Sequence, residues 1–279
     1  MKVTPNINEV RAARWQNPNE TWGFVPTMGY LHEGHLSLVR QARQENDRIA
    51  ASIYVNPTQF APTEDLSSYP RDLERDLDLL RAEGVDLVFT PSDNVMYPPD
   101  FQTAVTLSKV TQPLEGASRP THFAGVAIIV AKLFNIVQPT RAYFGQKDAQ
   151  QTVVLRQMAR DLNFNLNLVI CPIVREPDGL AMSSRNKYLS PAERKAALVL
   201  SRSLQQAQVV FEQGERDAAT LRRIMTDLIA AEPLARLDYV SAADPTTLIE
   251  LEQIEGQALF SMAVFIGKTR LIDNRIIGA

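Results

Sequence analysis

Cysteine is almost missing from this chain of 279 residues. The single one, Cys171, excludes an intrachain disulfide and a zinc site made of four cysteines. A long apolar run is missing as well, because the longest candidate, 123–137, contains Lys132 and Asn135 and is too short to span a bilayer. The first 15 residues lack the apolar centre of a secretory signal. We therefore expect a cytoplasmic protein without a membrane partner.

An excess of charge of either sign is absent too. Lys and Arg number 29 and Asp and Glu number 32, which gives a net charge of −3. A chain so nearly neutral gives no reason to expect binding of nucleic acid. The apolar fraction of 45% is too high for a disordered tail. The length suits one large domain or two modest ones.

Short apolar segments alternate with helical patterns through more than half of the chain. The expected strands are 23–27, 49–55, 85–90 and 142–144. The expected helices are 36–43, 73–82, 125–137 and 149–162, the last with an apolar face that includes Leu162. Strands that are apolar throughout are buried on both faces. The alternation therefore favours an α/β fold, a Rossmann-like parallel sheet with helices on both faces.

The pattern changes after Val174, where the turn residues 175–179 begin a second part. Ser190, Pro191 and Glu193 form a helix start with a capping box, which predicts a long helix to about residue 213. A second helix to about 231 and strands at 237–242, 257–266 and 270–273 should follow. We expect a smaller C-terminal α+β domain, with domains 1–174 and 175–279 and a hinge at the turn.

Two familiar phosphate motifs are absent. No two glycines have the G-x-G spacing of the dinucleotide fingerprint. Gly267, Lys268 and Thr269 are similar to the end of a P-loop, but Met262 stands where that motif requires glycine.

The segment VPTMGYLHEGH, residues 25–35, follows an expected strand and opens an expected helix. Ligands of open α/β sheets bind beyond the carboxyl ends of the strands, and a helix N-terminus there suits phosphate. His32 and His35 are three residues apart and can share one face of the first turn. Gly34 allows a nucleotide to approach the backbone. Two surface histidines without a ligand are the alternative, and zinc would need further ligands.

Four further segments carry polar side chains next to expected strands or helices. They are VNPTQF (55–60), LEGASRPTHFAG (114–125), YFGQKDAQQ (143–151) and GLAMSSRN (179–186). Asn56 and Gln59 can hydrogen-bond a polar substrate, although this segment alone favours an ordinary Asn-Pro turn. Lys147 could reach a phosphate, and Asp148 could cap the helix that follows.

The last of these segments contains Ser183, Ser184 and Arg185. Two hydroxyls and a guanidinium can bind a polyphosphate and stabilise a leaving group. A polar linker is the alternative here, as a solvated loop is for 114–125, where Arg119 precedes a buried helix and suits an anion.

With these segments the chain resembles the pantothenate synthetase (pantoate–β-alanine ligase) family. PTMGYLHEGH is similar to the HxGH motif of the HIGH-type nucleotidyltransferase superfamily, and SSRN is similar to its second phosphate motif. VNPTQF, LEGASRPTHF, FGQKDAQQ and LAMSSRNKYLS resemble blocks of the ligase, in the family's order, and LIDN at 271–274 is similar as well. The sequence departs from the usual family pattern at Thr58, Ala124, Gln146 and Ala149.

The resemblance implies ATP-dependent condensation of (R)-pantoate with β-alanine through pantoyl adenylate. It implies catalytic roles for His32, His35 and Lys147. It implies ATP-binding positions, which are Met28, Gly29, Tyr30, Leu31, His32, Glu33, Gly34, His35, Gly145, Gln146, Lys147, Asp148, Val174, Met182, Ser183, Ser184 and Arg185. It implies substrate-binding positions for pantoate or β-alanine, which are Asn56, Gln59 and Gln151.

The resemblance also implies Mg²⁺ carried on the ATP phosphates, no metal site of the protein itself, and a homodimer. Asp76 is either an outer ligand of that metal or a solvated helix residue. Two other activities stay open. One is an adenylyltransferase of the same superfamily that releases an adenylylated product. The other is a nucleotide-binding regulator without catalysis.

Overall fold

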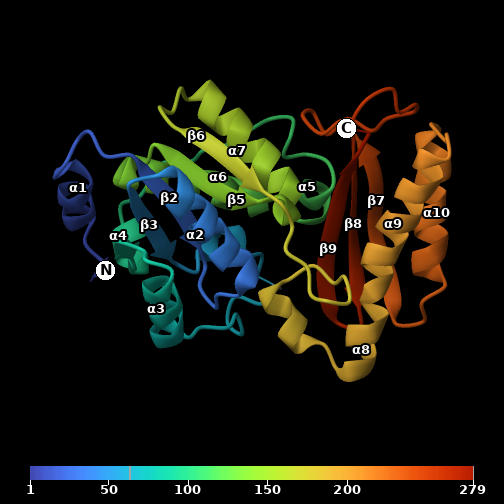
Figure 1. Ribbon diagram of the computed structural model, residues 1–279, viewed down its shortest axis with the longest axis horizontal. Coiled ribbons are helices and arrows are strands. Elements are labelled where there is room, and N and C mark those ends of the chain that lie inside the picture. The colour runs from blue at the N-terminus through green and yellow to red at the C-terminus, as the bar shows by residue number, and fades with distance from the viewer. Residues whose placement is uncertain (63, 279) are drawn as a thin grey trace.

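The computed structural model describes residues 1–62 and 64–278, and two halves lie side by side in it (Figure 1). The N-terminal half is a six-stranded sheet in the order β1-β4-β3-β2-β5-β6, and every neighbouring pair is parallel. Its elements are β1 (Lys2–Thr4), α1 (Ile7–Trp15), β2 (Trp22–Thr27), α2 (Glu33–Glu45), β3 (Arg48–Ile53), the 3₁₀ turn η1 (Pro57–Gln59), α3 (Leu73–Ala82), β4 (Leu87–Phe89), α4 (Asp93–Met96), α5 (Glu115–Ser118), α6 (His122–Val137), β5 (Arg141–Gly145), the 3₁₀ turn η2 (Gln146–Asp148), α7 (Ala149–Asp161) and β6 (Asn167–Cys171).

Helices cover both faces of this sheet because its central strands are apolar on both sides. Phe24 of β2 packs into a cluster with α1, α6 and α7. Its neighbour Val25 points to the opposite face and packs against α2 and α3. The predicted α/β class with helices on both faces is confirmed.

The order of the strands reverses at β2. From β2 the chain builds β3 and β4 on one side and then returns to build β5 and β6 on the other. Ligands of such sheets bind at this reversal, outside the carboxyl ends of the strands. The segments that follow Thr27 of β2 and Gly145 of β5 therefore meet at the place where the fold favours a ligand.

The C-terminal half is an antiparallel sheet in the order β7-β8-β9. Its helices α9 and α10 lie on the outer face of the sheet (Figure 1), and Leu204, Leu221 and Phe260 belong to the core between them. The elements are η3 (Ser184–Tyr188), α8 (Pro191–Ala196), α9 (Leu198–Glu212), α10 (Ala218–Ala230), β7 (Ala235–Ala243), β8 (Ala258–Ile266) and β9 (Thr269–Ile277). The smaller α+β unit is confirmed as well.

Some local predictions are wrong. The capping box at Ser190 forms, but the long helix expected after it is split at Ala197 into α8 and α9. No glycine or proline between residues 192 and 212 explains this break. Leu162 is 53% exposed and does not belong to a buried face. The structure also adds β1, α1 and β6, which sequence reasoning missed.

None of the described helices has the length and apolar character needed to cross a membrane.

Candidate active site

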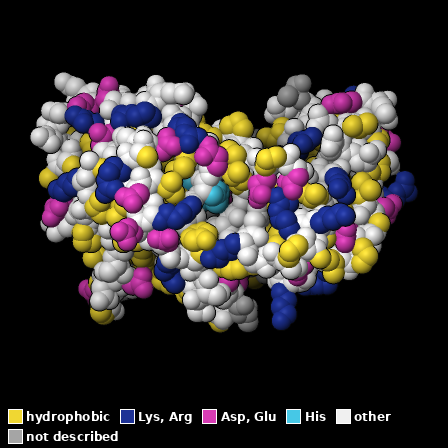
Figure 2. Space-filling view, turned by 60° about the horizontal axis from the view of Figure 1, so that its bottom comes forward, with side chains coloured by type: hydrophobic (Ala, Val, Ile, Leu, Met, Phe, Trp, Pro, Cys, Tyr) yellow, Lys and Arg dark blue, Asp and Glu magenta, His cyan; other side chains and the backbone are white. Residues whose placement is uncertain are grey.

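A cavity of about 1090 Å³ opens between the two halves. Thr27 at the end of β2, Gly145 at the end of β5 and His122 at the start of α6 line it from one side. Tyr239 of β7 and Asp273 of β9 line it from the other. Figure 2 shows histidine side chains at the hollow between the halves, with charged side chains of both signs around it. The predicted segments are thus brought together at the reversal of the strand order.

The turn after β2 is held by a carboxylate from another helix. Gly29 and Tyr30 both have positive φ angles, 82° and 51°. Asp76 of α3 is buried and accepts hydrogen bonds from the backbone N–H of Tyr30 (2.6 Å) and of Leu31 (2.7 Å). The expectation that Asp76 is a solvated helix residue is wrong. As an outer metal ligand it would have to share the two oxygens that hold this turn.

Hydrogen bonds fix which nitrogen of His32 and of His35 carries the proton. Nδ1 of His32 accepts from the backbone N–H of Gly34 at 3.1 Å, and Nδ1 of His35 accepts from the backbone N–H of His32 at 3.3 Å. The two rings lie 4.1 Å apart, centre to centre. Because both Nδ1 atoms accept, the hydrogen of each neutral ring is on Nε2. The pair therefore offers two N–H donors to an anion.

Both imidazoles are neutral in the free protein at pH 7. Burial, then the charge of Lys147, lowers the pKa of His32 from 6.5 to about 4. Burial, then His32 and Lys147, lowers the pKa of His35 to about 3. Lys147 supplies the positive charge near the pair, and the histidines supply hydrogen bonds.

These two shifts predict how stability depends on pH. Below pH 6.5 the unfolded chain binds protons at His32 and His35, whereas the folded chain binds them only at about pH 4 and 3. The unfolded state then holds more protons, so the free energy of unfolding falls as the pH drops from about 6.5 towards 3. Urea unfolding at a series of pH values measures this dependence. Between pH 6.5 and 3 the free energy of unfolding should fall less steeply for His35→Gln than for the wild-type protein. An unchanged slope for this variant would contradict the assignment.

Gly34 is needed by a neighbouring side chain. A Cβ atom at Gly34 would lie 2.9 Å from the imidazole of His32 and 3.9 Å from Cβ of Met182. The sequence suggested that glycine is needed here to let a nucleotide approach the backbone. The structure gives a second reason, because any side chain at this position would displace the His32 ring.

Lys147 lies in η2, directly beyond β5. Its Nζ lies 4.0 Å from the Asp148 carboxylate, which is half exposed. The prediction that Asp148 caps α7 is wrong, because its side chain makes no capping hydrogen bond. Asn274 of β9 instead holds this turn, donating from Nδ2 to the carbonyl of Lys147 (2.8 Å) and accepting from Nε2 of Gln146 (3.1 Å). Sequence reasoning gave Asn274 no role, although it lies in the LIDN run.

Of the predicted segment 182–185, Ser183 and Arg185 line the cavity, whereas Met182 and Ser184 do not. The backbone N–H of Met182 donates to the carbonyl of Val174 at 3.0 Å, which closes this segment on the predicted hinge. The hydroxyls of Ser184 and Tyr69 lie 3.4 Å apart. Arg185 makes a paired contact with Asp65, at 2.9 and 3.1 Å. Asp65 was missed by sequence reasoning because its loop shows no periodic pattern.

The amide side chains differ in how much hydrogen-bonding capacity they have left. Asn56 is buried, and its Nδ2 donates to Oε1 of Gln59 and to the carbonyl of Gly125, both at 3.1 Å. Its Oδ1 accepts from Thr58 and Tyr97. Asn56 therefore positions Gln59 and has no free amide group for a substrate.

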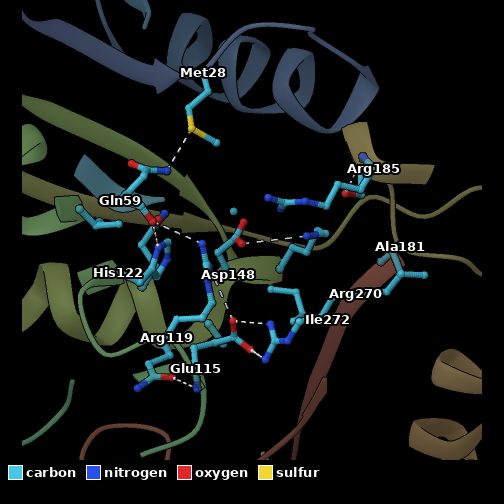
Figure 3. A pocket seen from close by; sticks show the side chains of 18 of the residues that line it. Met28, Gln59, Glu115, Arg119, His122, Asp148, Ala181, Arg185, Arg270 and Ile272 are labelled. Atoms are coloured by element: carbon cyan, nitrogen blue, oxygen red, sulfur yellow. Dashed lines mark hydrogen bonds and ion pairs between the residues drawn. The ribbon is translucent and has the colours of Figure 1, made fainter. Parts of the chain in front are cut away.

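Gln59 and Gln151 can still change partners. Nε2 of Gln59 donates to the sulfur of Met28 at 3.0 Å (Figure 3), and a thioether is a weak acceptor. Gln150 is buried and holds the backbone of Glu115, whereas Gln151 lines the cavity and makes no side-chain hydrogen bond within the described residues.

An ion-pair network that sequence reasoning missed joins the two halves in the wall of the cavity. Arg270 of β9 binds both oxygens of Glu115, at 2.7 and 2.8 Å (Figure 3). It also binds Asp238. The Tyr239 hydroxyl donates to Glu115 at 3.1 Å. Glu115 lies in the segment LEGASRPTHF, which resembles the family. The sequence around it does not indicate that its partner is Arg270, 155 residues further along the chain.

Comparison with known proteins decides the family. A family model described as pantoate-beta-alanine ligase matches residues 2–276. The chain belongs to the pantoate–β-alanine ligase family. The pantothenate synthetase of Roseiflexus sp. (strain RS-1) is 60% identical over 279 residues, with both chains covered completely. A crystal structure of pantothenate synthetase from Thermus thermophilus has a TM-score of 0.96 and 49% identity, again with full coverage of both chains.

A third member of the pantoate–β-alanine ligase family is known with ligands. The structure from Francisella tularensis is described as complexed with beta-gamma ATP and beta-alanine. It has a TM-score of 0.82 and 33% identity, and the match covers 99% of this chain and 97% of that one. Family membership over the whole length confirms a ligase and sets aside the two alternatives, an adenylyltransferase and a regulator.

Proposed function

We propose that this ligase condenses (R)-pantoate with β-alanine, and that ATP is converted to AMP and diphosphate through a pantoyl-adenylate intermediate. One observation carries the proposal. The two N–H donors of His32 and His35, together with Lys147, lie at the reversal of the strand order, and two exchangeable amides line the same cavity. The ligands named for the Francisella structure support ATP and β-alanine as substrates here.

In the first step the carboxylate of pantoate attacks the α-phosphorus of ATP and diphosphate leaves. The carboxylate is already a nucleophile, so this step needs alignment and stabilisation of charge rather than a base. His35, His32 and Lys147 act on the phosphates, and Gln59 and Gln151 hold pantoate. The backbone of residues 28–35 and 145–148, the region of Val174 and Met182, and the hydroxyls of Ser183 and Ser184 complete the nucleotide site.

Arg185 binds phosphate in this scheme by exchanging partners. In the free protein its charge is neutralised by Asp65. A polyphosphate presents more negative charge than one carboxylate, and guanidinium binds both in the same two-pronged way. Binding of ATP therefore moves Arg185 from Asp65 to the nucleotide.

Mg²⁺ fits this site as a companion of the nucleotide. Within residues 1–62 and 64–278 no cluster of three or more His, Cys, Asp or Glu side chains could hold a metal ion. The resemblance to the family implies that the ion would come with ATP and would neutralise charge on its phosphates. The residues of the chain bind and orient the nucleotide around it.

In the second step the amine of β-alanine attacks the acyl carbon and AMP leaves. Until then the acyl adenylate must be kept from water. We propose that residues 1–174 bind ATP and pantoate and that residues 175–279 act as a lid. Two contacts support this proposal, because Met182 bonds to Val174 and Arg185 bonds to Asp65 of the N-terminal half beside the cavity.

Closure of this lid predicts protection from protease. The exposed residue Lys187 is a trypsin site in the segment 174–190. ATP plus pantoate should slow cleavage after Lys187 several-fold, because a closed segment must unfold locally before it is cut. Cleavage after Arg160, on the exposed face of α7, should stay unchanged. Equal cleavage after Lys187 with and without ligands would argue against closure.

One assay tests the activity itself. The enzyme is mixed with ATP, Mg²⁺ and pantoate, and β-alanine is added later. We expect one equivalent of diphosphate and enzyme-bound pantoyl adenylate at first, and turnover to AMP and pantothenate after the amine arrives. Continuous product release that ignores β-alanine would overturn the proposal, and so would no diphosphate at all.

We also propose a homodimer located in the cytoplasm, on the strength of the resemblance to the family. The chain mass is 31.2 kDa. Size-exclusion chromatography with light scattering should therefore report twice that value, and the chain mass itself would contradict a dimer.

A further inference from the structure

His122 is the one histidine to which the proposed function gives no role. It is the first residue of α6 and lines the cavity (Figure 3). His35 lines the same cavity. The sequence segment that contains it, LEGASRPTHFAG, contributes no side chain to the scheme above. A histidine that faces a substrate cavity is a candidate for proton transfer.

The proton of His122 is placed opposite to that of the other two histidines. Its Nδ1 lies 2.9 Å from the backbone carbonyl of Gln59. A carbonyl can only accept, so Nδ1 of the neutral ring carries the hydrogen and Nε2 carries the lone pair. Nε2 has no hydrogen-bond partner in the described part of the chain, and it is not among the buried polar atoms that lack one. It therefore opens onto the cavity as an acceptor.

The carbonyl that holds His122 belongs to Gln59, whose side chain is assigned to pantoate. His122 thus lies beside the place where the acyl adenylate forms. The second substrate arrives as an ammonium ion, since a primary amine of this kind has a pKa of about 10. It has to lose a proton before its nitrogen can attack. The free ring nitrogens of His32 and His35 both carry a hydrogen, and of the two residues His35 lines the cavity. Neither can take a proton from the amine, whereas an acceptor can.

We propose that Nε2 of His122 receives the ammonium group of β-alanine and takes a proton from it. This proposal rests on the proposed function. The neutral amine then attacks the acyl carbon of pantoyl adenylate, and the C–N bond forms. The bond from that carbon to the phosphate oxygen breaks, and AMP takes its electron pair. The nitrogen loses its second proton to solvent as the amide forms.

The surroundings of His122 keep this nitrogen free of a proton. Burial, and then the charge of Arg119, lowers its pKa to about 4, while the bond to Gln59 and the carboxylates of Glu115 and Glu64 act in the opposite sense. The imidazole is therefore neutral at pH 7. The phosphate of the adenylate and the carboxylate of β-alanine bring negative charge into the cavity, and this raises the proton affinity of His122 during the reaction.

Two substitutions of His122 distinguish the role of Nδ1 from the role of Nε2. In His122→Asn the side-chain amide reaches the position of Nδ1, so it can still donate to the Gln59 carbonyl, but nothing replaces Nε2. In His122→Gln the amide reaches the position of Nε2 but cannot take a proton, and the bond to Gln59 is lost. Two rates are measured: pantoate-dependent exchange of diphosphate with ATP, and formation of pantothenate from preformed enzyme-bound adenylate.

We expect His122→Asn to exchange diphosphate at close to the wild-type rate. Its reaction with β-alanine at pH 7 should be slower by about 10², the usual contribution of a general base. The deficit should shrink as the pH approaches the pKa of the amine. It should nearly vanish with hydroxylamine, which is unprotonated at pH 7 and traps the adenylate as a hydroxamate.

Other outcomes overturn the proposal. They are a wild-type reaction of His122→Asn with β-alanine, an equal loss in both half-reactions, or an equal loss with hydroxylamine. An equal loss in both half-reactions would mean that His122 acts through Gln59 and pantoate. Failure of the proposed function shows differently, because the wild-type enzyme would then exchange no diphosphate in the presence of pantoate.

Discussion

Replacing His35 with alanine should slow the formation of pantoyl adenylate by about 10²–10³, the usual loss for one preorganised donor to a developing charge. The structure gives the reason. The Nδ1 atom of His35 is occupied by the backbone N–H of His32, so the remaining hydrogen points away from the helix on Nε2. Because the donor is held in place before the reaction, it stabilises the negative charge that moves onto the phosphates.

The measurement is the burst of diphosphate from enzyme, ATP and pantoate without β-alanine. His35→Gln and His35→Asn make a matched pair, because Gln can place an N–H donor near the position of Nε2 whereas Asn reaches only Nδ1. We expect Gln to recover part of the lost rate and Asn to recover none. The urea midpoint at pH 7 should change little for both, since His35 lines the cavity and does not belong to an apolar core. Near-normal diphosphate release from His35→Ala would refute the role.

The sequence predicted the place of the site well because that place depends on local pattern. An apolar strand that ends in GFVPT, a following helix start with two histidines, and a second strand that ends before Lys147 are all readable in short windows. Parallel strands bring such segments together at the reversal of their order. Family resemblance then supplied residue roles that the pattern alone left open.

What the sequence did not show depends on partners distant in the chain. Asp65 with Arg185 and Glu115 with Arg270 join segments that no local periodicity relates. The prediction that Asp76 is a solvated helix residue was wrong for a different reason. Asp76 lies four residues before the buried Leu80, on the inner face of α3, so its spacing already indicated burial. The error came from reading a carboxylate on a helix as solvated, without asking which backbone donors it could serve.

The proton positions of the three histidines could not be predicted either. They follow from one backbone contact at each ring: an N–H at His32 and at His35, and a carbonyl at His122. The same side chain therefore has two opposite functions in one cavity. Sequence spacing predicts that imidazoles will be present, and only the fold decides whether each of them donates or accepts.

The largest loss of stability is expected from Asp273→Asn. Arg175, at the predicted hinge, contacts both oxygens of Asp273 at 2.7 and 2.9 Å, and the carboxylate side chain is 1% exposed. Removing one partner of a buried ion pair typically costs about 3–5 kcal/mol. We expect about 3 kcal/mol, at the lower end, because Arg175 keeps part of its surface in water. Urea unfolding at pH 7 measures the loss.

Two further variants serve as controls for the prediction about Asp273→Asn. Glu250→Gln breaks the exposed pair of Glu250 with Arg222 and should cost less than about 1 kcal/mol. The double variant Arg175→Met, Asp273→Leu removes both charges and should be more stable than Asp273→Asn alone, because no buried charge is left without a partner. Asp273 precedes Asn274, which holds the turn of Lys147, so the single variant should also weaken ATP binding. If Asp273→Asn proved as stable as Glu250→Gln, the hinge would not depend on this pair, and the lid would have to be positioned by the contact of Glu115 with Arg270 instead.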